Sequence, residues 1–171
     1  ADQGELQLGL ERGAVGVTTN PFLANLALRK HRALWATEID AVLAQGLEAE
    51  PRAEALMRIV VTHTAEKLTG FVCGQVNPSR AGEREAMLAM ARRYSRWAPN
   101  IAVKLPATAA GMDVLEECIA EGITVTSTVN FTVPQVIAVA ERHRLGIQRA
   151  RESGVSPRRA ISPSARASST T

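Results

Sequence analysis

The chain has 171 residues, of which 46% are hydrophobic and 22% are charged. This composition is typical of a globular domain with a substantial core, and it excludes a collagen-like or largely disordered protein. No run of about 18 apolar residues occurs, which argues against a membrane span, and the polar first residues argue against a secretory signal peptide. Two cysteines are too few for a disulfide framework, so we expect a cytoplasmic protein.

The net charge of +3 raises the question of a nucleic-acid partner. Four arginines and one acidic residue fall within residues 151–171, which leaves sixteen basic and sixteen acidic residues in the rest of the chain. The body of the chain is therefore neutral, and its composition disfavours binding to a polyanion. A small basic protein that uses residues 142–171 on nucleic acid or on an acidic partner stays open as an alternative.

Short segments rich in Val, Ile and Thr alternate with segments of helical periodicity. Four strands are expected, at Val15–Asn20, Gly70–Val76, Asn100–Pro106 and Gly122–Asn130. Four helices are expected, at Pro51–Leu68, at Arg84–Trp97, between an N-cap at Thr108 and a stop at Gly122, and from about Pro134 onward. Strands that alternate with helices predict βαβ units and a parallel sheet.

Each expected strand has one apolar face and one face with polar groups, because side chains alternate along a strand. The polar groups near the strand ends are Thr18, Asn20, Gln75, Lys104 and Thr128. A doubly wound sheet is apolar on both faces, whereas a parallel barrel can hold polar groups at the C-terminal rim of its lumen. The pattern favours TIM-barrel geometry for residues 1–154. Residues 155–171, rich in Ser, Pro and Arg, are expected to be a disordered tail.

Lys104 interrupts the apolar run Asn-Ile-Ala-Val-Lys-Leu-Pro. A lysine in such a strand either extends to solvent or stands in a functional site. Its chemical use in a site is nucleophilic attack on a carbonyl to form a Schiff base, which requires the neutral amine. The residues alone leave both interpretations open.

Four motifs give the chain a specific resemblance to a known family. Gly16-Val-Thr-Thr-Asn-Pro21 resembles the second-strand signature of the transaldolase family, and the segment Gly70–Pro78 is similar to the third strand. Asn100-Ile-Ala-Val-Lys-Leu-Pro-Ala-Thr108 resembles the strand of the Schiff-base lysine, and Gly122–Gln135 resembles the next strand with its Phe-Ser-x-x-Gln turn. The motifs follow the family order over residues 14–153. The resemblance implies part of a (β/α)8 barrel, roughly strands 2–5.

The resemblance also implies a reaction. Lys104 matches the lysine that attacks a ketose carbonyl, after which an aldehyde leaves and an enamine remains. Transfer of the dihydroxyacetone unit to a second aldehyde makes a transaldolase of the pentose phosphate pathway type, and protonation makes a fructose-6-phosphate aldolase-like lyase. Thr18 and Asn20 match substrate-binding positions, and Thr128 matches a hydroxyl that holds the catalytic water. Gln75 stands where transaldolases carry a glutamate and where the aldolase branch carries glutamine.

The sequence departs from the family at both ends. Neither Asp2 nor Glu5 matches the aspartate of the family's first strand, and strands six to eight have no counterpart. A truncated, non-catalytic family member is therefore an alternative. Four strands cannot close an eight-stranded barrel, and open sheet edges predict self-association. The resemblance implies a small sugar phosphate as partner, with no cofactor, no metal and no membrane partner.

Some of these residues also have purely structural interpretations. Gln75 taken alone is a polar filler of a barrel lumen, and the threonines of the fourth expected strand need no function because threonine favours strands. His63 lies on an apolar helical face and is expected to be a packed core histidine. Residues 142–144 are expected to form a solvated helix face.

Overall fold

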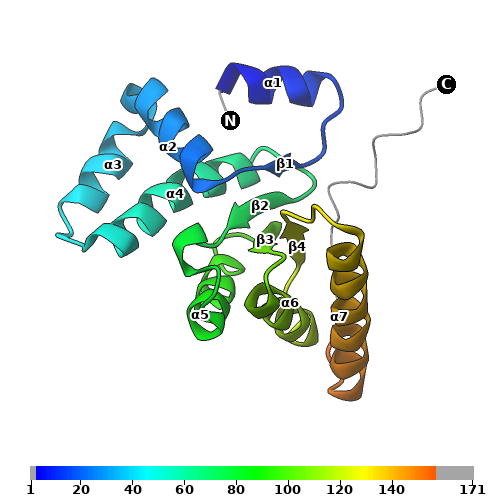
Figure 1. Ribbon diagram of the computed structural model, residues 1–171. Coiled ribbons are helices and arrows are strands. Elements are labelled where there is room, and N and C mark those ends of the chain that lie inside the picture. The colour runs from blue at the N-terminus through cyan, green and yellow to red at the C-terminus, as the bar shows by residue number, and fades with distance from the viewer. Residues whose placement is uncertain (1–2, 157–171) are drawn as a thin grey trace. The chain divides into compact units, whose positions relative to one another are not determined.

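The computed structural model describes residues 3–156, which form two compact units (Figure 1). One unit comprises residues 3–75 and 97–101, and the other comprises residues 76–96 and 102–156. The predicted tail falls almost wholly outside the described residues, so its disorder stays a prediction, as does the treatment of residues 1–154 as one domain.

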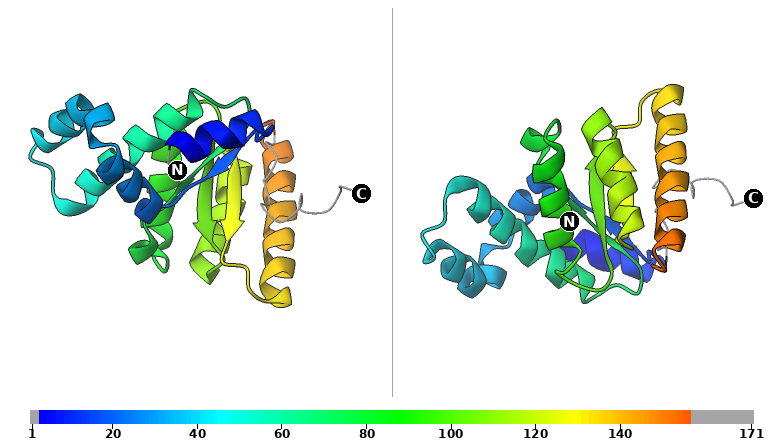
Figure 2. Two further views of the ribbon diagram at one scale, coloured as in Figure 1. Left: turned by 90° about the horizontal axis from the view of Figure 1, so that it is seen from above. Right: turned by 90° about the horizontal axis from the view of Figure 1, so that it is seen from below.

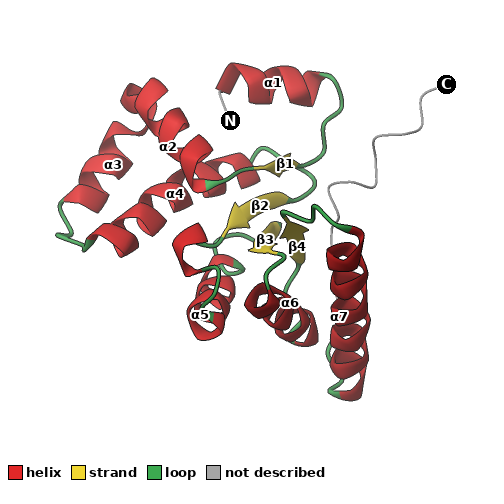
Figure 3. Ribbon diagram, viewed as in Figure 1, coloured by secondary structure: helices red, strands yellow, loops and turns green. Residues whose placement is uncertain are grey.

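Four short strands form one sheet in the order β1-β2-β3-β4 (Figure 3). Their bounds are Val17–Thr18, Val72–Gln75, Ile101–Pro106 and Val125–Thr128. The pairs β1–β2 and β3–β4 are parallel. Each strand lies inside its predicted segment but is shorter than predicted. The first is shortest because Asn20 and Pro21 already begin the helix that follows.

Every strand is followed by a helix, and the strands are neighbours in the order in which the chain visits them. Parallel strands joined in this way require a crossover, here helical, between each strand and the next. The arrangement is that of part of a (β/α)8 barrel, and the predicted fold class is confirmed. The strand order leaves β1 and β4 as the two edges of the sheet.

The first unit carries most of the early helical segments: α1 Gln3–Glu11, α2 Pro21–Lys30, η1 Arg32–Trp35, α3 Ala36–Leu43 and α4 Ala49–Ala65. Of these, α4 matches the helix predicted at Pro51–Leu68, whereas the earlier four were not predicted. They are short, from four to ten residues each. They are stabilised by packing instead, since Trp35 and residues of α2, α3 and α4 are buried together in the first unit.

The second unit packs helices against β3 and β4. Its helical segments are η2 Pro78–Arg80, α5 Arg84–Tyr94, α6 Ala109–Ala120 and α7 Val133–Glu152. Thr108 caps α6 by accepting a hydrogen bond from the Gly111 backbone nitrogen at 3.0 Å, as predicted. Gly122, with φ +74°, ends the same helix in the left-handed conformation that glycine tolerates. The predicted inner face of α5 is confirmed, because Met87, Met90, Ala91 and Tyr94 are buried.

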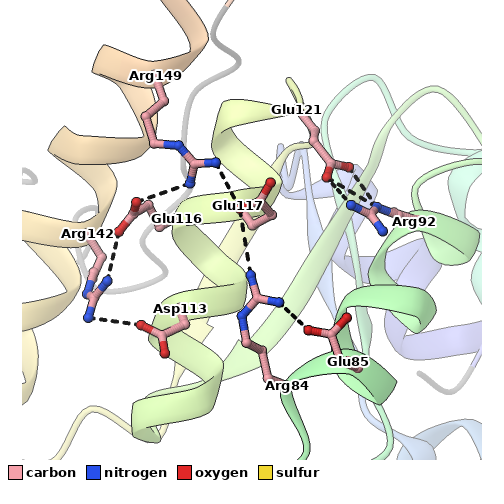
Figure 4. A network of polar contacts seen from close by, with 9 residues as sticks. All are labelled: Arg84, Glu85, Arg92, Asp113, Glu116, Glu117, Glu121, Arg142 and Arg149. Atoms are coloured by element: carbon pink, nitrogen blue, oxygen red, sulfur yellow. Dashed lines mark hydrogen bonds and ion pairs between the residues drawn. The ribbon is translucent and has the colours of Figure 1, made fainter.

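Ion pairs hold α7 to α6, which run side by side (Figures 2 and 4). The carboxylate of Glu116 accepts hydrogen bonds from Arg142 at 2.9 Å and from Arg149 at 3.1 Å. Burial alone would raise the pKa of Glu116, but these two hydrogen bonds outweigh burial and hold it below its usual range. Arg142 also pairs with Asp113 at 2.9 Å. Arg142, in the solvated face predicted for residues 142–144, is 43% exposed, but its guanidinium is also bound by two carboxylates, which was not predicted.

Within residues 3–156, no helix combines the length and the apolar character that crossing a membrane requires.

Candidate active site

Lys104 lies in the longest strand of the sheet. Its neighbours Ala102, Val103 and Leu105 are fully buried, whereas Lys104 itself is half-buried. Its backbone carbonyl accepts a hydrogen bond from the Val76 nitrogen at 3.2 Å, which fixes the strand at this residue. Within residues 3–156 the Lys104 side chain makes no hydrogen bond or ion pair, so no carboxylate of the described chain binds its amine.

The fourth strand places hydroxyl groups beside this lysine. Lys104 pairs in register with Thr126, and Pro106 pairs with Thr128. Residues opposite one another in a parallel pair point to the same face, so Lys104 and the two threonines share a face, as predicted. Thr126 is fully buried, and its hydroxyl has no hydrogen-bond partner in the described part of the chain. Thr128 is half-buried at the end of its strand.

The loop after β4 is held in an unusual backbone conformation. Val129 has φ 59°, the left-handed region that a β-branched residue rarely adopts. The side chain of Gln135 holds this loop: its carbonyl oxygen accepts from the backbone nitrogens of Phe131 and Thr132, both at 3.1 Å. Its amide nitrogen donates to the carbonyl of Ala107 at 3.2 Å. One glutamine thus ties the loop after Thr128 to the loop after the lysine strand.

A second side chain links the lysine loop to the chain that follows β2. The hydroxyl of Thr108 donates to the carbonyl of Ala81 at 2.6 Å and also caps α6. The backbone nitrogen of Ala107 donates to the carbonyl of Thr128 at 2.9 Å. Three loops of the second unit are therefore fastened to one another at the ends of the strands, around the residues that flank Lys104.

The other predicted site residues belong to the first unit. Thr18 is exposed in the two-residue strand β1, where it pairs with Cys73. Asn20 lies beyond the strand, and its side-chain oxygen accepts from the Leu23 nitrogen at 2.8 Å as the N-cap of α2. Gln75 is half-buried at the end of β2, and no side-chain hydrogen bond to it occurs within residues 3–156.

The predicted site is thus divided between the units. The second unit brings Lys104 and Thr128 to one face, and the first unit holds Thr18, Asn20 and Gln75. The chemical roles of these residues stay predictions. In the described residues, no group of three or more His, Cys, Asp or Glu side chains is arranged to hold a metal ion.

The predicted core histidine is only half-buried. His63 meets the edge of Trp35 at a ring-centroid distance of 6.0 Å, and its Nε2 lies 3.4 Å from a carboxylate oxygen of Glu38. A hydrogen bond from its own backbone, and then the one from His63, hold the pKa of Glu38 below its usual range. His63 therefore joins α4 to α3 at the surface of the first unit and is not a fully packed core residue.

The family model described as Transaldolase/Fructose-6-phosphate aldolase matches residues 2–163. The chain belongs to this family. It is 30% identical over 152 residues to a transaldolase of Mycolicibacterium paratuberculosis, covering 82% of this chain and 40% of the relative. It is 31% identical over 165 residues to a transaldolase of Neisseria gonorrhoeae, covering 90% and 47%. A transaldolase 2 of a Nostoc species is 29% identical over 159 residues, covering 85% and 42%.

The transaldolase resemblance of the four motifs is thereby confirmed. The chain spans less than half of the length of the curated relatives it matches. Two features of the candidate site were not predicted from the sequence. Gln135 was noted only as part of the family turn, although its capping-box spacing after Thr132 is a signal for its role in holding the loop. The conformation of Val129 leaves no trace in the sequence, because nothing about a valine predicts a positive φ.

Proposed function

We propose that this chain carries out transaldolase-type chemistry through a Schiff base on Lys104. The single observation that most supports this proposal is the position of Lys104 in the fold. Of the three lysines in the sequence, Lys30 and Lys67 are exposed on or after helices, whereas Lys104 is half-buried in a strand whose flanking residues are fully buried. An amine that no described carboxylate binds is free to attack a carbonyl.

The proposed reaction begins when the neutral Lys104 amine attacks the carbonyl carbon of a ketose phosphate. The carbinolamine loses water to give an iminium, which accepts the electron pair of the carbon–carbon bond as that bond breaks. The departing carbon's hydroxyl gives its proton to water as it becomes the aldehyde of an aldose phosphate, and a three-carbon enamine remains on the lysine. Attack of this enamine on a second aldehyde, followed by hydrolysis, completes transfer of the dihydroxyacetone unit. In this proposal Thr128 holds the water that adds to the iminium, and Thr18 and Asn20 contact the substrate.

A second candidate, favoured by Gln75, is a fructose-6-phosphate aldolase-like lyase. A glutamine amide cannot take up a proton as a carboxylate does, so the proton transfers that a glutamate supports are lost at this position. The enamine would then take a proton from water, and hydrolysis of the resulting iminium would release dihydroxyacetone without an acceptor. Both reactions are sugar-phosphate chemistry, and we propose a cytoplasmic location because the chain has few cysteines.

Borohydride trapping tests the proposed nucleophile. The chain is incubated with fructose 6-phosphate or dihydroxyacetone, reduced with borohydride, digested and mapped over residues 99–112. We expect a substrate-dependent adduct confined to Lys104 and absent from Lys104→Arg, which keeps the positive charge but cannot form a Schiff base. Adducts spread evenly over the three lysines, or no adduct, would identify a non-catalytic family member.

Product analysis separates the two reactions. Fructose 6-phosphate is supplied alone or with an acceptor aldose phosphate, and free dihydroxyacetone is compared with the transferred product. Transfer predicts product only with the acceptor, and the lyase predicts dihydroxyacetone without it. Gln75→Glu is the matched variant, and it is expected to shift the ratio of products toward transfer. An unchanged ratio would show that residue 75 does not decide between the two outcomes.

A further inference from the structure

The side-chain amide nitrogen of Gln135 donates to backbone carbonyls in two different loops of the second unit. It donates to the carbonyl of Ala107, in the loop after β3, at 3.2 Å, and to that of Val129, in the loop after β4, at 3.5 Å. Ala107 is the third residue after Lys104, and Val129 directly follows Thr128. Gln135 therefore joins the two loops that begin next to the residues of the proposed chemistry.

Val129 adopts a backbone conformation that its own side chain disfavours. At φ 59° it lies in the left-handed region, where a branched β-carbon crowds the backbone. Such a conformation persists only where surrounding contacts hold it. Gln135 binds the Val129 carbonyl and also accepts from the backbone nitrogens of Phe131 and Thr132, both at 3.1 Å. Gln135 thus supports the turn that ends β4 directly after Thr128.

The position of the Thr128 hydroxyl depends on the backbone around it. Within residues 3–156 this hydroxyl makes no hydrogen bond, and the side chain is half-buried. The backbone carbonyl of Thr128 accepts from the nitrogen of Ala107 at 2.9 Å, and the carbonyl of Ala107 accepts from Gln135. The distance between the Thr128 hydroxyl and the Lys104 amine therefore depends on how firmly these two loops are held together.

We propose that Gln135 is a positioning residue for the reaction of Lys104. It keeps the Thr128 hydroxyl where that group binds the water of the Schiff-base steps, and this role rests on the chemistry proposed for Lys104. The carbinolamine takes up a proton and loses water to become the iminium, and the reverse step adds water and releases the proton to solvent. Because one step serves both directions, loss of positioning slows the formation and the hydrolysis of the iminium alike and leaves its amount at equilibrium unchanged.

Gln135→Glu isolates the contacts on which this inference depends. A carboxylate still accepts from the two backbone nitrogens just before α7, and glutamate suits the third position of a helix that Thr132 caps, so α7 keeps its first turn. A carboxylate has no proton to donate to the carbonyls of Ala107 and Val129. Gln148→Glu makes the same substitution at an exposed position of the same helix and is the matched control.

Borohydride quenching at a series of times tests the inference. The chain is mixed with dihydroxyacetone and quenched, and the fraction of Lys104 that carries the reduced adduct is measured by peptide mapping. Gln135→Glu is expected to reach the plateau of the wild type at least about tenfold more slowly, whereas Gln148→Glu should match the wild type in rate and plateau. A lower plateau reached at an unchanged rate would show a merely structural role and overturn the inference.

Val129→Gly provides a rescue of Gln135→Glu. Glycine adopts a positive φ without the steric crowding that valine meets, so the loop keeps its turn with less support from the side chain of residue 135. The double variant should therefore form the adduct faster than Gln135→Glu alone. General destabilisation of the chain would not be relieved in this way, because glycine adds no contact.

The outcomes separate this inference from the chemistry on which it rests. If the wild type forms the adduct and Gln135→Glu forms it at the same rate, the positioning role is overturned and the proposed function of Lys104 stands. A double variant no faster than Gln135→Glu would also overturn the role assigned to the loop. If the wild type forms no adduct on Lys104, the Schiff-base chemistry itself fails, and this inference fails with it.

Discussion

The strand that carries Lys104 is longer and more deeply buried than the strand that carries Thr18. The six residues of β3 include four that are buried, and its following loop is fastened by Thr108 and Gln135. In contrast, β1 has two residues, and Thr18 is exposed. The buried strand and its hydrogen-bonded loop therefore fix the positions of the side chains around the lysine motif within the second unit. The motif at Thr18 depends on a single strand partner and on the cap of one helix.

The difference extends to the glycines that let helices approach the sheet. A Cβ on Gly111, in the first turn of α6, would collide with the carbonyl oxygen of Pro106 at the end of the lysine strand. A Cβ on Gly9 of α1 would meet only Ala14, at an ordinary contact distance of 3.7 Å. The close approach of α6 to β3 thus requires glycine, whereas the α1 position does not.

The largest expected effect comes from Gly111→Ala. The new methyl group cannot be accommodated without moving α6 or the end of β3, so we expect the free energy of unfolding to fall by about 3 kcal/mol. Gly9→Ala is the matched helical glycine, and there alanine should stabilise the chain by roughly 0.5 kcal/mol through helix propensity. Urea titrations measure both. Equal effects at the two positions would contradict the tight frame that we assign to the lysine strand.

Removing either of the two helix caps next to the motifs should also lower the free energy of unfolding, but by less than Gly111→Ala. Asn20→Ala removes one hydrogen bond to α2 and should cost about 1 kcal/mol. Thr108→Ala removes the cap of α6 and also the bond to Ala81, so it should cost about 2 kcal/mol. Urea titrations of the two variants, with Thr108→Ser as the conservative control that keeps both bonds, measure the difference. A Thr108→Ala loss no greater than that of Asn20→Ala would show that the link between loops contributes no stability.

The alternation of strands and helices could be predicted from sequence because the second unit follows simple periodicities. The inner face of α5, the cap at Thr108 and the shared face of Lys104 and Thr128 all came from spacing alone, and the structure confirms them. The early helices could not be predicted from spacing, because α2 and α3 are short segments that are stabilised by contacts with residues distant in sequence. The motif residue Asn100 shows the same limit. Its amide donates to the carbonyls of Ala65 and Gly70, at 3.0 and 2.9 Å, a structural role that the lysine motif does not reveal.

For the candidate site, the residue types and the strand faces they share could be predicted from the sequence, but the contacts between side chains could not. Face assignment placed Lys104 beside the threonines of β4, but it gave no sign that the Thr126 hydroxyl is buried without a partner. Nor could it foresee the positive φ of Val129, which depends on how Gln135 holds the loop. The partners of Arg142, Asp113 and Glu116, could not be predicted because they come from a different helix. Each of these features depends on tertiary contacts, which one strand or helix does not encode.

The smallest expected effect on the free energy of unfolding comes from removing charged side chains at the surface. This effect should differ between the two units and depend on pH. Glu116→Gln leaves Arg142 and Arg149 without their shared carboxylate and should lower the free energy of unfolding by about 1 kcal/mol at pH 7. The pKa of Glu116 is below its ordinary value of 4.5 in the folded chain, so its contribution is complete above that value and is lost as the pH falls through the folded pKa. The wild type and the variant should therefore converge in stability once the pH falls below the folded pKa of Glu116.

In the first unit, Glu38→Gln is the matched control. The pKa of Glu38 is also lowered, but its side chain is 44% exposed and its contact with His63 is long, at 3.4 Å. Its effect on the urea midpoint at pH 7 should be smaller than that of Glu116→Gln, because solvent screens an exposed pair. A Glu116→Gln difference that does not shrink as the pH falls through the folded pKa of Glu116 would trace the loss to packing of the side chain. The ion pairs of α6 and α7 would then not be what makes the second unit the more firmly held of the two.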